Sequence, residues 1–181
     1  MFRKYALFNV LGIFFREPFR KFYLREAAKK AKVSTQTAKL QLDWLAKNGF
    51  LKREKLGNLY LFRANYGSQK FRHFKIAFNI FELEKTGLVE YLKSKYEINS
   101  LVVFGSFAKG EDTPESDIDI LLITNSKQKP DMINYIKKMK KDISLLQYSY
   151  KEWEERAKKN KPFYEQILIH GIVLSGNPPV I

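Results

Sequence analysis

The fold of the chain's second half is decided by residues 105–119, which read GSFAKGEDTPESDID. A Gly-Ser pair opens the stretch, and an Asp-Ile-Asp triplet closes it after ten intervening residues. The short apolar runs at 101–104 and 118–123 are rich in β-branched residues and are typical of buried strands. We therefore expect a polar loop held between two buried strands.

The two carboxylates of this loop are predicted to lie together. In a strand, residues i and i+2 lie about 7 Å apart on one face, so Asp117 and Asp119 project together while Ile118 and Ile120 face the core. Two ionised carboxylates at that spacing repel each other, and a divalent cation relieves the repulsion. Oxygen ligands suit Mg²⁺ or Mn²⁺, and the chain has no Cys and two His for a zinc site.

The Gly-Ser pair predicts a phosphate site beside this metal. Gly105 allows close approach of the backbone, and the Ser106 hydroxyl with nearby N–H groups can bind phosphate oxygens. Further phosphate contacts are predicted for Lys109, Gly110 and Ser116. A metal beside bound phosphates indicates phosphoryl or nucleotidyl transfer.

With these residues in place, the segment resembles the signature of the DNA polymerase β-like nucleotidyltransferases, and most closely their small minimal nucleotidyltransferase branch. The resemblance covers roughly residues 87–176. It implies that Asp117 and Asp119 ligate Mg²⁺ or Mn²⁺ and that a nucleoside triphosphate, expected to be ATP, is the donor.

The resemblance also implies a third carboxylate on a later strand. The best match is Asp142, which opens the apolar run 142–148 after a Lys-rich helix. It would be the third metal ligand and a candidate general base for the acceptor hydroxyl. Asp131 was weighed as well, but it follows Pro130 at a predicted helix start and suits a cap.

Length and composition bound the class of protein. A chain of 181 residues can hold one domain or two small ones. The absence of Cys fits a reducing compartment, so a cytoplasmic location is expected. Residues 3–15 imitate a signal peptide, but Asn9 interrupts the apolar run, Arg16-Glu17 ends it and it is too short to cross a bilayer. No membrane association is predicted.

Charge is distributed unevenly along the chain. Residues 1–86 carry 19 Lys and Arg against 6 Asp and Glu, whereas residues 87–181 carry 14 against 13. The first part therefore holds almost all of the net charge of +14. Such asymmetry indicates a polyanionic partner for the first part, most simply DNA.

The pattern of the basic part predicts three helices and a hairpin. Helices are expected at 5–15, at 24–31 and from Ser34 to Asn48-Gly49, followed by strands at 50–55 and 59–63 that turn at Gly57-Asn58. The stretch resembles the winged helix-turn-helix family. In that family's mode of binding, groove contacts are predicted for Thr35, Gln36 and Lys39, and phosphate contacts for Lys29, Lys30, Lys32, Lys52, Arg53 and Lys55. Use of the same surface for a protein partner is the alternative.

A connector with an aromatic seam joins the two parts. Phe71, Phe74, Phe78 and Phe81 recur at alternating steps of three and four, which is a heptad-like spacing. This seam either pairs two copies into a homodimer or docks the two domains of one chain. The predicted fold class is α+β, with a winged helix-turn-helix at 1–65, a connecting helix at 66–86 and a small mixed-sheet nucleotidyltransferase domain at 87–181.

Two functions follow as hypotheses. In the first, the protein is an enzyme that transfers a nucleoside monophosphate to an acceptor hydroxyl and also binds DNA. Short members of the branch include antitoxins that modify a partner toxin, so a HEPN-type toxin is a candidate acceptor by resemblance alone. In the second, the protein is a DNA-binding transcriptional regulator whose nucleotidyltransferase-like domain binds a ligand or partner without catalysis.

Overall fold

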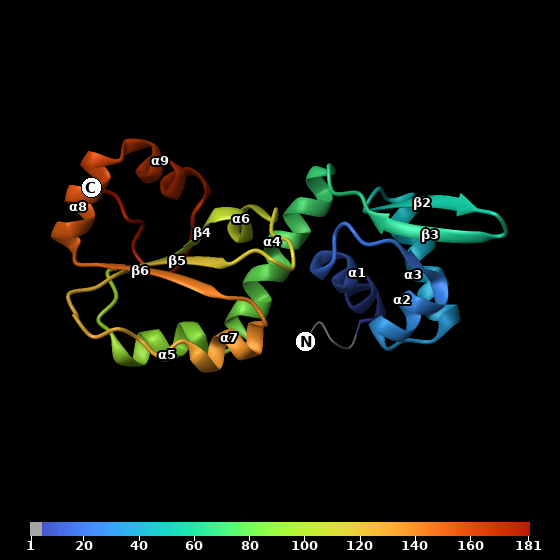
Figure 1. Cartoon of the computed structure of the whole chain (residues 1–181), viewed down its shortest axis with the longest axis horizontal. Coiled ribbons are helices and arrows are strands. Elements are labelled where there is room, and N and C mark those ends of the chain that lie inside the picture. The colour runs from blue at the N-terminus through green and yellow to red at the C-terminus, as the bar shows by residue number, and fades with distance from the viewer. Residues whose placement is uncertain (1–4) are drawn as a thin grey trace. The chain divides into compact units, whose positions relative to one another are not determined.

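The computed structural model describes residues 5–181, so Arg3-Lys4, which begin the stretch that imitates a signal peptide, lie outside it. The chain divides into two compact units, Met1–Phe78 and Asn79–Ile181. Helix α4 (Gln69–Glu84) contains the division between them. Each unit has its own small sheet and its own helices, which confirms the α+β class (Figure 1).

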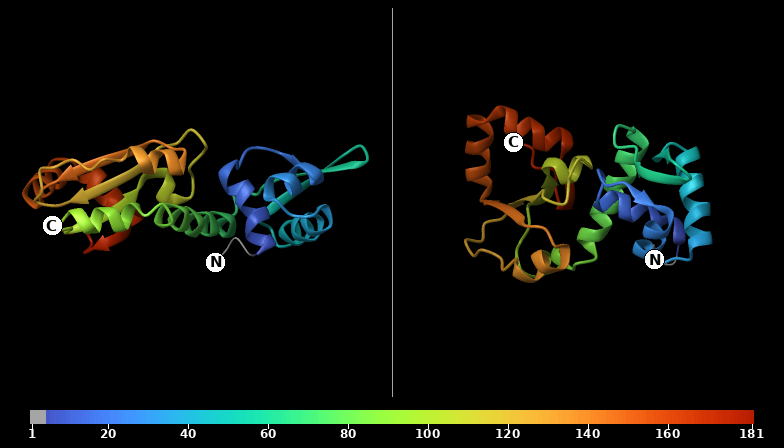
Figure 2. Two further views of the ribbon diagram at one scale, coloured as in Figure 1. Left: turned by 90° about the horizontal axis from the view of Figure 1, so that it is seen from below. Right: turned by 45° about the vertical axis from the view of Figure 1, so that its right-hand side comes forward.

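The first unit has three helices and a three-stranded sheet. Its elements are α1 (Ala6–Arg16), β1 (Phe22–Tyr23), α2 (Leu24–Ala31), α3 (Thr35–Lys47), β2 (Leu51–Leu56) and β3 (Leu59–Ala64). The sheet is antiparallel with the order β1-β3-β2. In Figure 2 the β2–β3 hairpin extends beyond the three helices of this unit.

Local signals of the sequence fix the ends of these elements. The Ser34 side chain accepts a hydrogen bond from the Thr37 N–H at 3.0 Å and so caps α3, as predicted. Gly49, with φ +79°, follows Asn48, the residue that caps the end of that helix. The hairpin turns at Gly57, with Leu56 paired to Leu59. The two-residue strand β1 was missed because it is too short to show any alternation.

The aromatic seam of α4 is largely used by the first unit itself. Phe71 is fully buried in that unit's core, and its ring centroid lies 5.0 Å from that of Phe15. Phe78 also packs on Phe15, at 5.1 Å, and Phe74 packs on Phe50 at 5.2 Å. Three of the four rings therefore contact rings of the first unit, although Phe74 stays 45% exposed, and Phe81 belongs to the second unit. A dimer built on the whole seam would require Phe71 to leave this core.

The second unit is a four-stranded mixed sheet with helices on both faces (Figures 1 and 2). Its elements after α4 are α5 (Leu88–Lys95), β4 (Ser100–Phe104), α6 (Gly105–Lys109), β5 (Ile118–Ile123), α7 (Ile133–Met139), β6 (Ile143–Tyr148), α8 (Tyr150–Lys159), α9 (Lys161–His170) and β7 (Ile172–Gly176). The strand order is β6-β5-β4-β7, with β6 parallel to β5 and the other pairs antiparallel.

Alternation along the strands divides the second unit's core into two layers. Ile118 and Ile120 of β5 join the cluster that includes α5, whereas Leu121 and Ile123 join the cluster around Trp153 of α8. Asp119 alternates with Ile118 and Ile120, so it belongs to the Trp153 face, at the start of β5. The sequence placed Ile118 and Ile120 toward a single core, whereas the face that carries Asp119 is also covered by a core layer.

No helix among residues 5–181 combines the length and the apolar character needed to cross a membrane.

Candidate active site

The turn from β4 into α6 lies in close contact with the carboxylate of Asp119. Phe104 at the end of β4 is paired with Asp119 of β5, and Gly105 follows with φ +71°. A Cβ atom placed on Gly105 would lie 3.2 Å from the Asp119 Cγ and would overlap its Oδ2 atom. Gly105 is therefore required here both by its backbone conformation and by the close approach of Asp119.

Asp117 and Asp119 lie near each other at the start of β5. Burial raises the pKa of Asp119, the charge of Asp117 raises it further, and a hydrogen bond from Ser144 acts in the opposite direction. Asp117 is exposed and Asp119 is half-buried. A pair of oxygen ligands whose mutual repulsion a cation would relieve, one of them in close approach to the backbone of Gly105, fits a divalent metal ion.

The residues predicted to bind phosphate differ in whether their polar groups already form hydrogen bonds within the protein. Ser106 lies half-buried in the first turn of α6, and Lys109 lies half-buried in its last. Gly110 ends α6 in the left-handed region at φ +66°, and its N–H donates to the Phe107 carbonyl at 3.3 Å. The Ser116 hydroxyl accepts from the Thr113 N–H at 2.9 Å. The Gly110 amide and the Ser116 hydroxyl therefore have internal partners, while Ser106 remains the candidate best placed for phosphate.

A buried polar network holds the loop that carries Asp117. The Asn79 amide donates to the Asp112 carboxylate at 2.7 Å and to the Phe107 carbonyl at 2.9 Å. The Lys141 ammonium lies 3.5 Å from Asp112, donates to the Ser116 carbonyl at 3.1 Å and also donates to that of Thr113. These residues were missed by sequence reasoning, because their partners are 25 to 33 positions away and no local motif marks them.

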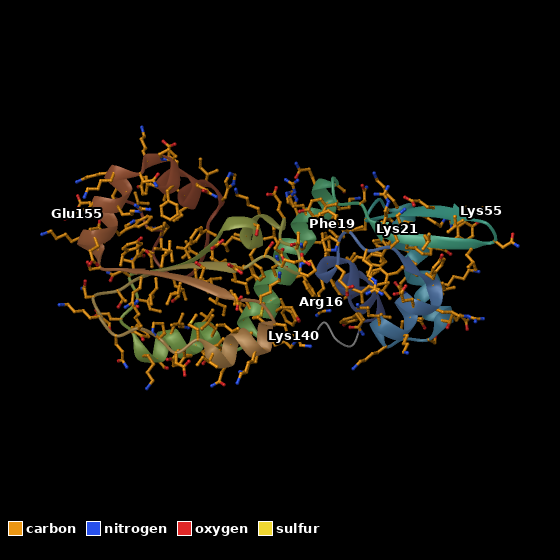
Figure 3. All side chains as sticks on the ribbon, in the orientation of Figure 1. Arg16, Phe19, Lys21, Lys55, Lys140 and Glu155 are labelled. Atoms are coloured by element: carbon orange, nitrogen blue, oxygen red, sulfur yellow. The ribbon has the colours of Figure 1, made fainter. Side chains whose placement is uncertain are left out.

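Asp142 does not join Asp117 and Asp119 in a three-acid cluster. Across residues 5–181, no group of three or more His, Cys, Asp or Glu side chains is arranged to hold a metal. Asp142 is exposed and lines a pocket of about 450 Å³ at the end of α7. The lining residues are Pro114, Glu115, Ser116, Asp117, Ile136, Lys137, Lys140, Lys141 and Asp142. Figure 3 labels Lys140 of this set, next to the end of α7.

Asp131 lies where a helix cap is expected. Its Oδ1 atom accepts a hydrogen bond from the N–H of Ile133, the first residue of α7, at 3.0 Å. The alternative third acid of the sequence analysis is thus engaged in starting a helix.

The nine predicted DNA contacts all lie on the surface of the first unit. Six come from α2, from α3 and from the turn between them, and three come from β2. Two of the nine have ion-pair partners inside the unit: Lys30 with Glu17, and Arg53 with Asp43 at 3.2 Å. Lys55 extends near the far end of the hairpin (Figure 3).

The fold and the acid pair define the class of domain, and comparison with known proteins agrees. Residues 85–174 match the family described as "Nucleotidyltransferase domain".

Three similar proteins of Methanocaldococcus jannaschii each carry the name "Putative protein adenylyltransferase". One is 44% identical over 45 residues, which is 25% of this chain and 45% of the relative. Another is 54% identical over 37 residues, or 19% of this chain and 37% of the relative. A third is 55% identical over 31 residues, or 17% and 32%. The chain thus spans less than half the length of the relatives it matches.

Proposed function

We propose that the protein is a metal-dependent nucleotidyltransferase that moves a nucleoside monophosphate from a nucleoside triphosphate, with ATP the expected donor, to an acceptor hydroxyl. The observation that carries this proposal is the Asp117–Asp119 pair set against Gly105 inside the matched domain. The pair supplies oxygen ligands for a cation, and the Gly-Ser turn beside it can approach phosphates.

Each residue then has a definite task. Asp117 and Asp119 hold the Mg²⁺ or Mn²⁺ ion, which when bound stabilises negative charge on the phosphates. Ser106 contacts a donor phosphate, and the network of Asn79 and Lys141 keeps the loop of Asp117 in place. The acceptor oxygen forms a bond to the α-phosphorus while the bond to pyrophosphate breaks. The hydroxyl proton passes to a base, for which Asp142 in the adjoining pocket is the candidate.

The proposed acceptor is a hydroxyl of another protein. Support comes from the names of the similar proteins, which specify protein adenylyltransferases. By resemblance to short members of the branch, a HEPN-type toxin is the proposed partner, which would make this protein its antitoxin.

Labelled ATP tests the enzymatic proposal. The full chain is incubated with Mg²⁺, α-labelled ATP and a HEPN-type protein of the same organism. We expect label on that protein, and we expect Asp117→Ala to abolish it because one ligand charge is lost. If wild type binds ATP without transferring label to any protein acceptor, the alternative of a ligand-binding regulatory domain is supported instead. If it neither binds ATP nor transfers label, nucleotidyl transfer is the wrong function.

We also propose that the first unit is a winged helix that binds DNA, with α3 in the major groove and the β2–β3 hairpin as the wing. Three helices with an adjoining hairpin support this assignment. The strongly basic charge of residues 1–86 and the exposure of all nine predicted contact residues support a DNA partner. One observation favours a protein partner: Leu40 and Trp44 of α3 are 66% and 47% exposed.

Salt dependence of binding checks the DNA proposal. Affinity of the full chain for duplex DNA should fall with a log–log slope of about −0.9 per phosphate neutralised. Lys52→Ala or Lys55→Ala should each make the log–log slope shallower, by the equivalent of about one phosphate contact. Gln36→Ala should instead relax the preference for DNA sequence. Lys93→Ala, an exposed lysine of α5, is the control and should change nothing. A full-length protein without DNA affinity at low salt would instead favour protein contact through Leu40 and Trp44.

A further inference from the structure

The register between β5 and β6 determines which residue of β6 lies beside the acid pair. The strands are parallel, with Ile118 opposite Ile143 and Asp119 opposite Ser144. Neighbouring strands lie about 4.8 Å apart, and partners in register project from the same face. The residue directly beside Asp119 on its own face is therefore Ser144. Asp142 comes two positions earlier.

Ser144 faces Asp119 across the pair of strands β5 and β6. Its hydroxyl acts on the Asp119 carboxylate as a hydrogen-bond donor would, in the direction that lowers the pKa of Asp119. Ser144 and Asp119 are both half-buried, and β6, which carries Ser144, is an edge strand of the sheet. A serine at this position fixes the direction of the carboxylate but adds no negative charge.

Asp142 has different surroundings. Its carbonyl accepts from the Ile118 N–H at 2.9 Å, which continues the strand pairing, while the residue itself is exposed. It lines the pocket at the end of α7 together with Asp117, Lys137 and Lys140, whereas Asp119 does not line this pocket. The described residues also hold no three-acid group that could bind a metal.

We propose that β6 serves the metal site through Ser144 and not through Asp142. In this arrangement two carboxylates ligate the cation, Ser144 is a positioning residue that orients Asp119, and Asp142 belongs to the pocket beside them. Because Mg²⁺ is commonly bound by one or two carboxylates together with substrate phosphates, the ion should bind well only with the nucleotide. This inference rests on the proposed nucleotidyltransferase function.

Binding of Mn²⁺ tests the proposal without relying on turnover. Free Mn²⁺ is followed by electron paramagnetic resonance in titrations of the full chain, with and without a non-hydrolysable ATP analogue. We expect the analogue to tighten binding by about tenfold or more. Ser144→Ala should weaken binding by about tenfold, in the range seen when a partner of a metal ligand is removed, and Ser144→Thr should restore it because the hydroxyl is kept.

Two variants that change charge distinguish the role of Ser144 from the role of Asp142. Ser144→Asp should tighten Mn²⁺ binding and reduce its dependence on the analogue, because it adds a carboxylate beside Asp119. Asp142→Asn should leave Mn²⁺ affinity within about twofold of wild type, whereas Asp119→Asn should remove it; loss of a ligand costs far more than a change in a neighbouring pocket. Thermal unfolding of each variant shows that the fold is kept.

Outcomes for this inference and for the proposed function are distinguishable. If Asp142→Asn weakens Mn²⁺ binding as much as Asp119→Asn while Ser144→Ala is silent, Asp142 is a ligand and the inference is wrong, but the enzymatic proposal stands. If the wild type binds no Mn²⁺ even with the ATP analogue, the proposed metal-dependent function itself fails.

Discussion

Replacing Asp119 by Asn is expected to lower nucleotidyl transfer by about 100-fold or more. Metal stabilisation of phosphate charge contributes several kcal/mol, and each ~1.4 kcal/mol corresponds to a tenfold change in rate. Asn has nearly the same shape as Asp and can still accept the hydrogen bond from Ser144, so the sheet should be unchanged. Initial rates of label transfer measure the effect. Asp131→Asn removes an exposed carboxylate of the same unit and should leave the rate near that of the wild type.

Stability of this variant provides a second, independent readout. The pKa of Asp119 is raised, chiefly by burial and next by the charge of Asp117. Because the folded protein holds this proton more tightly than the unfolded chain, the ionised carboxylate destabilises the fold at pH values above its folded pKa. Without metal, Asp119→Asn should therefore unfold at a higher temperature than the wild type at neutral pH, and the difference should vanish as pH falls toward the unfolded pKa. A lower unfolding temperature at neutral pH would show that the carboxylate has a structural task.

Much of this architecture could be predicted because its signals are local. The Ser34 cap, the Gly49 helix end and the Gly57 turn depend on residues only a few positions apart. The strands on either side of residues 105–117 could be predicted because they are short, apolar and bounded by polar loops. The two-residue period alone placed Asp119 on the opposite face of β5 from Ile118 and Ile120, but it did not show that a second core layer covers that face.

The partner of Asp119 on β6 could not be predicted in the same way. Asp142 and Ser144 are two positions apart, so both fall on the same face and the alternation cannot choose between them. Only the parallel register of β5 and β6 shows which of the two residues lies beside Asp119. That register depends on how α7 and its loops return the chain to the sheet. Asp142 was favoured because the resemblance implies a third carboxylate on a later strand, whereas the structure places Ser144 beside Asp119.

The use of the α4 aromatic residues illustrates the same limit. Spacing of Phe71, Phe74 and Phe78 correctly indicates one covered face of a helix, but it does not say what covers it. Phe15 and Phe50, which pack on these rings, lie 24 to 63 positions before the rings that they contact. A second copy and a second domain were considered from the sequence, and packing on the first unit's own core was not.

Gly105→Ala is expected to be the most damaging single change outside the acid pair. An L-residue in the left-handed region costs about 1–2 kcal/mol, and overpacking costs about 1–3 kcal/mol more. The strain can be relieved if the Asp119 carboxylate rotates away, because the overlapping atom is the end of that side chain. Relief of the strain therefore displaces a metal ligand. We expect a lower free energy of unfolding in chemical denaturation and a loss of nucleotidyl transfer comparable to that of Asp119→Asn.

Gly87→Ala is the matched control for this prediction. Gly87 lies in the same unit and has a similar φ of +81°, but a Cβ atom there would have nothing within 4 Å. Gly87→Ala should lower the free energy of unfolding by the backbone cost of about 1–2 kcal/mol while keeping nucleotidyl transfer. In the Gly105→Ala background, Asp119→Ala should recover part of the lost stability, because the Asp119 Cβ lies at an ordinary 3.4 Å from the added methyl group. Additive effects of the two changes, or full activity of Gly105→Ala, would show that Gly105 is not there to make room for Asp119.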